Sequence, residues 1–117
     1  MLNDFHTDHD YLASGYTDMR KSIDGLAALV QESFGLDPFS PGLFVFCNKE
    51  RNKLKILFWD HNGFWLYYRR LERGKFQWPA ENTKLVTISY RELRWLLDGL
   101  SLVQPRAHRE VKERIVV

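Results

Sequence analysis

Cysteine is almost absent from this chain, because Cys47 is the only one among its 117 residues. A single thiol cannot form an internal disulfide, which excludes the small secreted folds that several disulfides stabilise. The chain also lacks any apolar run close to the roughly 18 residues that a membrane-spanning helix requires. Its first residues include Asp4 and are not followed by the apolar core of a signal peptide. The sequence therefore predicts a protein without membrane association in the reducing cytoplasm.

Repeats, low-complexity tracts and Ser/Gly linkers are also missing, so nothing in the sequence indicates an internal domain boundary. Hydrophobic residues make up 44% of the chain and aromatic residues 15%, which excludes intrinsically disordered and collagen-like proteins. A chain of this length has room for one full core. We predict a flexible arm over residues 1–10, a single domain over residues 11–104, and a tail or short helix over residues 105–117.

Motifs for catalysis are missing as well. The sequence has neither a Gly-rich phosphate-binding loop nor a Gly-x-Ser-x-Gly turn, and no further ligand cluster joins His6 and His9 in a metal site. Cys47 lies in an apolar segment typical of a core strand. Two-metal chemistry needs converging carboxylates, whereas Asp18 and Asp24 fall on nearly opposite sides of the helix predicted below. We expect no catalytic residue, metal or cofactor, and no enzymatic activity.

Apolar residues recur at helical spacing between Thr17 and Phe34. Thr17 is expected to cap this helix and Gly35 to end it. Gly25 inside it costs about 1 kcal/mol relative to alanine, so we expect a close packing contact to compensate. A second helix is predicted to begin at Ser89, where a glutamate three residues later completes a capping box, and to stop near residue 99.

Two cations, Arg20 and Lys21, fall in the first turn of the first predicted helix, where they oppose the helix dipole. One interpretation is an anion site formed by these side chains and the exposed N–H groups of the helix start. The other is pairing with Asp18 or Asp24, or simple solvation. The sequence leaves both open.

Strand-like segments occupy residues 11–13, 43–47, 53–59, 64–71 and 85–88, with a turn over residues 37–42 and Pro79 at a strand end or edge. The segment Asp60–Gly63 predicts a hairpin, because Asn62 and Gly63 tolerate the positive φ of a type I′ turn. The fold class predicted is α+β, with an antiparallel β-meander of about four to five strands packed with two main helices.

The hairpin loop determines which strand residues share a face, because side chains alternate across a strand. One face carries Leu54, Ile56, Phe58, Trp65, Tyr67 and Arg69. The second carries Lys53, Lys55, Leu57, Trp59, Phe64, Leu66, Tyr68 and Arg70. We expect a helix to cover the first face and the basic, aromatic second face to remain in water.

Positive charge is concentrated between Lys49 and Lys75, where eight basic residues and three acids leave +5, against −3 for the remainder of the chain. Cations interleaved with aromatic rings are typical of surfaces that contact phosphates and stack on bases. Cations at strand ends also prevent edge-to-edge pairing, and aromatic residues in strands commonly serve packing. Both interpretations stay open, because a charge pattern carries no specificity of its own.

Several linked motifs follow one another in the order of a known family. They are Gly15–Val30, Asp37–Ser40, Leu43–Asn48, Leu54–Asp60, Gly63–Pro79 and Leu93–Gly99. Together they resemble the accessory proteins encoded by the second open reading frame of insertion-sequence-sixty-six transposons, often called TnpB, a name shared with an unrelated RNA-guided nuclease. The resemblance implies a protein made beside a separate transposase and needed with it for full transposition. It implies no catalytic residue, because the family's accessory role is not assigned to a reaction.

The function expected from residues and resemblance together is a non-enzymatic accessory factor for transposition. In one version it binds double-stranded transposon-end DNA, with contacts from Arg20, Lys21, Lys53, Lys55, Arg69 and Arg70. In the alternative it binds the transposase of the same element without touching DNA, and the contacts are Trp59, Phe64 and Tyr68.

Overall fold

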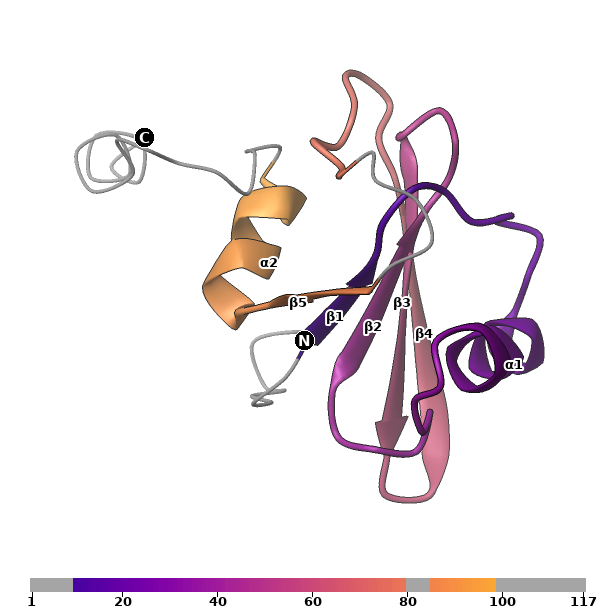
Figure 1. The fold of residues 1–117 in the computed structure, drawn as a ribbon. Helices are drawn as coiled ribbons and strands as arrows, with labels where there is room; N and C mark the ends of the chain where they lie inside the picture. Colours follow the sequence, from indigo (N-terminus) through magenta and orange to yellow (C-terminus); the bar gives the residue numbers. More distant parts are fainter. Residues whose placement is uncertain (1–9, 80–84, 99–117) are drawn as a thin grey trace.

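The computed structural model describes residues 10–79 and 85–98, which form a five-stranded sheet and two helices (Figure 1). In chain order the elements are β1 (Asp10–Ala13), α1 (Ile23–Ser33), β2 (Leu43–Cys47), β3 (Lys53–Asp60), β4 (Gly63–Arg70), β5 (Leu85–Ile88) and α2 (Tyr90–Leu97). The predicted arm and tail lie outside the described residues, as do His6 and His9, except that Asp10 is the buried first residue of β1.

The sheet is mixed, which corrects the prediction of an antiparallel meander. Its strand order is β4-β3-β2-β1-β5, and β1 and β2 run parallel. The connection explains the difference, because α1 lies between these two strands in the chain and a helical crossover brings the second strand back in the same direction. β2, β3 and β4 do form a meander, and β5 pairs antiparallel with β1. The α+β class is confirmed.

The hairpin of β3 and β4 has the predicted register, with Leu57 opposite Leu66, so each face carries the residues expected of it. The turn differs from the prediction. Asp60 pairs with Gly63, which makes Gly63 a strand residue, and the positive φ of 61° falls on His61. The Asn-Gly pair therefore does not provide the two central residues of the turn.

Replacing His61 with glycine is expected to raise the free energy of unfolding by about 0.5 kcal/mol. The change relieves roughly 1–2 kcal/mol of left-handed backbone strain, which outweighs the larger entropy of glycine in the unfolded chain. Urea unfolding followed by tryptophan fluorescence measures the difference. Asn62→Gly is the matched control and is expected to destabilise the protein, because positive φ at non-glycine residues 10–79 and 85–98 is confined to Arg51 and His61. A more stable Asn62→Gly variant would contradict this turn geometry.

Helix α1 begins at Ile23 and not at the predicted Thr17. The N–H of Thr17 donates instead to the carbonyl of Cys47 at 2.8 Å, which ties this segment to the end of β2. Met19 packs against the core all the same. The apolar residue that suggested an earlier helix start is therefore packed against the core from an irregular loop and not from a helix. Gly35, with a φ of 66°, follows the end of the helix as predicted.

The contact expected at Gly25 is local and is not packing against another element. A methyl group there would lie 3.2 Å from Cβ of Lys21, four residues earlier, and Gly25 lies in the first turn of α1 and not in a helix interior. The capping box predicted for the second helix is confirmed. At the start of α2, the N–H of Glu92 donates to Oγ of Ser89 at 3.1 Å, and the N–H of Ser89 donates to Oε1 of Glu92 at 2.8 Å. Neither described helix has the length and apolar character needed to cross a membrane.

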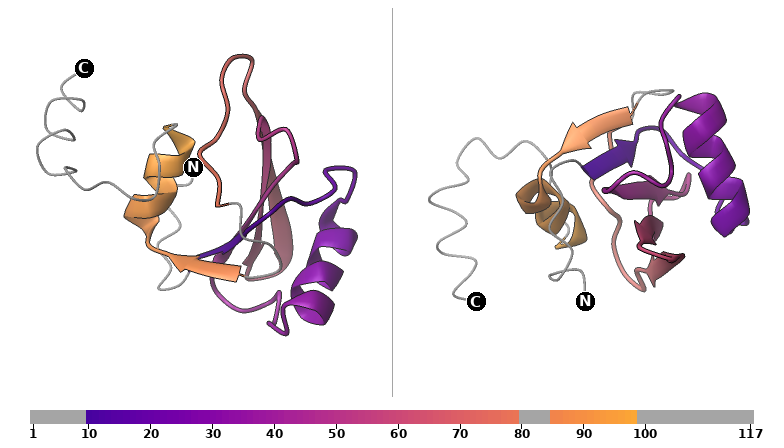
Figure 2. Two further views of the ribbon diagram at one scale, coloured as in Figure 1. Left: turned by 45° about the horizontal axis from the view of Figure 1, so that its top comes forward. Right: turned by 90° about the horizontal axis from the view of Figure 1, so that it is seen from below.

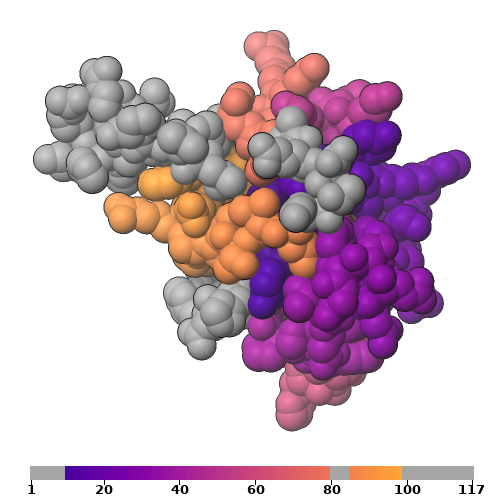
Figure 3. Space-filling model, in the orientation of Figure 1, coloured from indigo at the N-terminus to yellow at the C-terminus, as the bar shows by residue number. Residues whose placement is uncertain are grey.

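A helix packs against each face of the sheet, so the expectation that the second face would stay open is wrong for the part that α1 covers (Figure 2). Helix α2 and the segment 76–78 pack over Leu54 and Ile56 on the first face. That segment forms no strand before Pro79. Helix α1 packs over Leu57 on the second face. In the space-filling view, α2 and β5 (orange) and the segment containing α1 (purple) form separate sides of the molecule (Figure 3).

Candidate nucleic-acid interface

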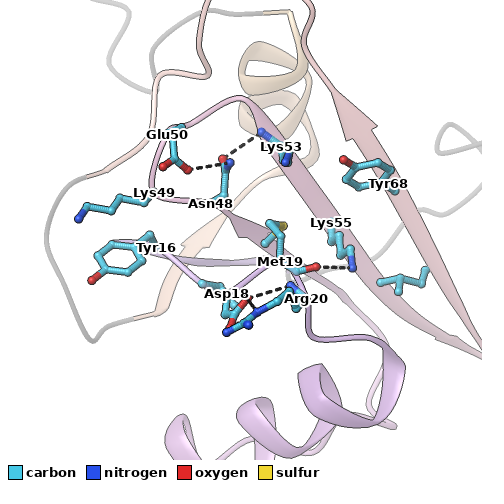
Figure 4. Close-up of a pocket in the computed structure, with 12 residues that line it drawn as sticks. Tyr16, Asp18, Met19, Arg20, Asn48, Lys49, Glu50, Lys53, Lys55 and Tyr68 are labelled. Atoms are coloured by element: carbon cyan, nitrogen blue, oxygen red, sulfur yellow. Dashed lines mark hydrogen bonds and ion pairs between the residues drawn. The ribbon is translucent and has the colours of Figure 1, made fainter.

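Helix α1 covers only part of the second sheet face, and a surface depression lies beside the rest (Figure 4). Its walls come from residues 16–20, residues 48–50, β3 and β4, and its volume is about 760 Å³. Its charged side chains are Asp18, Arg20, Lys49, Glu50, Lys53 and Lys55, and its exposed rings are Tyr16 and Tyr68. Cations outnumber acids here, so the surface attracts anions. We call it the Tyr16–Tyr68 groove.

Asn48 organises the turn that carries two of the lysines. It is buried, and its side-chain oxygen accepts hydrogen bonds from the backbone N–H groups of Asn52 and Lys53, both at 3.0 Å. Its amide nitrogen donates to Oδ1 of Asn52 at 2.8 Å. Arg51 closes the turn with a φ of 64° and donates its N–H to the carbonyl of Asn48. Nothing in the sequence indicated this role for Asn48.

Lys55 has a structural role that the sequence did not indicate. Its Nζ donates to the backbone carbonyls of Met19 at 2.8 Å and Lys21 at 2.9 Å, and lies 5.8 Å from the ring centroid of Tyr68. Lys55 thereby joins the loop before α1 to the sheet while its charge stays in the groove. A substitution here would disturb both the loop and the charge, so Lys55 is a poor probe of ligand binding.

Arg20 and Lys21 precede α1, which corrects their placement in its first turn and removes the argument for an anion site at the helix start. Arg20 Nη2 lies 2.7 Å from Asp18 Oδ2, so pairing, the other interpretation, holds for Arg20. The hydrogen bonds from Arg20 lower the pKa of Asp18 to about 2, and the same bonds raise the pKa of Arg20. Lys21 lines a neighbouring depression of about 660 Å³ that also includes Asp18.

The last two predicted cations lie on opposite faces of the sheet. Arg69 stands opposite Leu54 in the register and therefore belongs to the face that α2 covers. Arg70 shares a face with Lys53, but its Nε donates to Oε2 of Glu72 at 2.8 Å, which raises the pKa of Arg70. Of the predicted cations, the groove brings together Arg20, Lys53 and Lys55.

The predicted partner contacts belong to two separate surfaces. Trp59 and Phe64 pack with Phe39 near the hairpin turn, with centroid distances of 4.8 Å between Phe39 and Trp59 and 4.9 Å between Trp59 and Phe64. Tyr68 lies four residues along β4 from Phe64, about 13 Å away, and belongs to the groove. We call the first group the aromatic triad. Phe39, which is 54% exposed, was not among the predicted contacts, because it lies in the segment that the sequence predicts only as a turn between two elements.

Comparison with known proteins gives the family. The family model described as IS66 Orf2-like protein matches residues 8–107. The chain belongs to this family. It is 38% identical over 96 residues to the uncharacterized protein y4hO of Sinorhizobium fredii. The aligned residues make up 82% of this chain and 84% of y4hO. It is 34% identical over 89 residues to the uncharacterized protein y4jC of the same organism, which covers 76% of each chain. No solved structure matches.

Membership confirms the resemblance and places this IS66 Orf2-like protein in a family of transposition accessory proteins that is not a known catalytic family. Burial raises the pKa of the Cys47 thiol to about 12, so at neutral pH this sulfur is a poor nucleophile. Within residues 10–79 and 85–98, no group of three or more His, Cys, Asp or Glu side chains could hold a metal ion.

Proposed function

We propose that this IS66 Orf2-like protein is a non-enzymatic accessory factor that works in the cytoplasm with a separate transposase and binds transposon-end DNA through the Tyr16–Tyr68 groove. The observation that carries the proposal is the combination of cations and exposed rings in one depression. Transposition acts on DNA, and the phosphate backbone is the anion that such a surface meets there.

The available charge of the groove comes mainly from Lys49 and Lys53. Within the part of the chain that the structure describes, the ion pairs are Arg20 with Asp18 and Arg70 with Glu72, so neither lysine takes part in one. The pair of Arg20 with Asp18 is exposed, and an exposed ion pair contributes little stability. Arg20 can therefore exchange the carboxylate for a phosphate at small cost.

Fluorescence anisotropy with labelled transposon-end DNA tests the proposal. Affinity is expected to fall steeply between about 50 and 200 mM salt, because each phosphate contact releases counterions. The double variant Lys49→Ala/Lys53→Ala should reduce the slope of log affinity against log salt by about 2 and weaken binding at least about tenfold. Arg69→Ala is the matched control, since it removes a cation from the opposite sheet face and should leave the slope nearly unchanged. Equal effects of the two changes, or binding insensitive to salt, would contradict the groove as the DNA surface.

The aromatic triad supports a second candidate, a module that binds the transposase itself. Phe39 is 54% exposed although it contacts Trp59 and Phe64, and exposed aromatic clusters are typical of interaction hot spots. Co-purification of the transposase with and without end DNA separates the two functions. Loss of the complex with Phe39→Ala, but not with Lys49→Ala/Lys53→Ala, would favour the interaction module. Capture that needs DNA and the two lysines would favour the DNA-binding function.

A further inference from the structure

We propose that the Tyr16–Tyr68 groove takes an unpaired stretch of DNA, with bases stacked on its two tyrosine rings, in preference to an intact duplex. This inference rests on the proposed function, because it specifies the form of DNA that the same groove binds.

Both tyrosine rings of the groove are open to solvent. Tyr16 is 65% exposed and Tyr68 is 54% exposed, although nearby core rings such as Phe44 and Phe46 are buried. The two tyrosines lie at opposite ends of the groove, with Lys53 and Lys55 between them (Figure 4). Filling the protein core therefore does not explain why these two positions carry aromatic rings. Exposed rings are what unpaired bases need, because every base has a face that can stack.

Each of the two tyrosine rings has a lysine beside it. Lys49 Nζ lies 5.7 Å from the ring centroid of Tyr16, and Lys55 Nζ lies 5.8 Å from that of Tyr68. A ring beside a cation can hold a base and the phosphate attached to it at the same time. Proteins that bind single strands combine stacking platforms with a positively charged groove in this way. The repetition of the arrangement at both ends of one groove suits successive nucleotides of one strand.

The shape of the groove also suits an unpaired strand. It is an open depression with a volume of about 760 Å³. A depression of this size can receive one or a few flipped-out nucleotides. A duplex keeps its bases stacked on each other, so its phosphates can reach the lysines of the groove but its bases cannot stack on the tyrosine rings.

The test compares a labelled strand of about 20 nucleotides with the same strand annealed to its complement, by anisotropy at low salt. The wild-type protein is expected to bind the single strand at least about tenfold more tightly. Tyr68→Ala should weaken single-strand binding by about 5- to 100-fold, the effect of losing one base–aromatic stack, and should change duplex binding less than twofold. Tyr68→Phe should retain single-strand binding, because the ring remains.

Trp65→Ala is the matched control, since Trp65 is an exposed ring of the same strand on the opposite face and should not affect binding. Thermal melting shows that each variant is folded. A duplex bound as tightly as the single strand, or a Tyr68→Ala variant that binds the single strand normally, would overturn this inference and leave the proposed function standing. Absence of binding to either form of DNA would overturn both.

Discussion

Trp78→Ala is expected to lower the free energy of unfolding by about 3–5 kcal/mol, a large part of the stability of a domain this small. Trp78 is 5% exposed and packs with Phe76 over the core between the sheet and α2. Its Nε1 donates to the carbonyl of Ala13 at 3.0 Å, which ties the irregular segment to the end of β1. Alanine would leave a cavity and remove this bond. Thermal unfolding should show the Tm falling by roughly 12 °C or more.

Two variants separate the contributions to that loss. Trp65→Ala is the matched control, because Trp65 is 46% exposed, and it should cost less than about 1 kcal/mol. Trp78→Phe keeps most of the ring but removes the donor, and is expected to cost about 1–3 kcal/mol. If Trp78→Ala costs no more than Trp65→Ala, the segment 76–78 does not cover the core as described.

Asn48→Ala is expected to have the second largest effect, a loss of about 1–3 kcal/mol in the free energy of unfolding. The side chain of Asn48 accepts two backbone N–H groups and donates to Asn52, so alanine leaves these groups without their partner. The same turn carries Lys49 and Lys53 into the groove. The variant should therefore also weaken DNA binding at temperatures where it is folded. Urea unfolding and anisotropy measure the two effects.

Asn62→Ala provides the comparison for Asn48. Asn62 is exposed in the other turn of β3, and its replacement should change stability by no more than about 0.5 kcal/mol. Similar losses for the two asparagines would show that the Asn48 side chain does not hold its turn together.

Much of the sheet could be predicted because its signals are local. Alternation of side chains and a short loop were enough for the register of β3 and β4, and the capping box was enough for the start of α2. The start of α1 could not be predicted in this way. Met19 has helical spacing from Ile23, but the bond from Thr17 to Cys47 across the molecule decides that residues before Ser22 form a loop.

The candidate site was predicted in part. Lys53, Lys55 and Tyr68 were recognised as neighbours because they share one sheet face. Tyr16 could not be predicted from the sequence, although it lies in one of the motifs that indicated the family, because nothing near it in the chain shows that it lines a groove with residues of β3 and β4. The charge pattern predicts a surface cation at Lys55, yet its ammonium group donates to two carbonyls more than thirty positions away in sequence.

The sequence alone determined the α+β class, the strands of the central hairpin, the cap of α2 and the family, because each depends on neighbouring residues or on motifs read in order. Only the tertiary structure decided that β1 runs parallel to β2, that a helix packs against each sheet face, and that Tyr16 lines the same groove as Lys53 and Tyr68. These features depend on contacts between segments distant in sequence. Long-range packing stabilises such contacts, and the spacing of apolar residues along a short segment does not predict them.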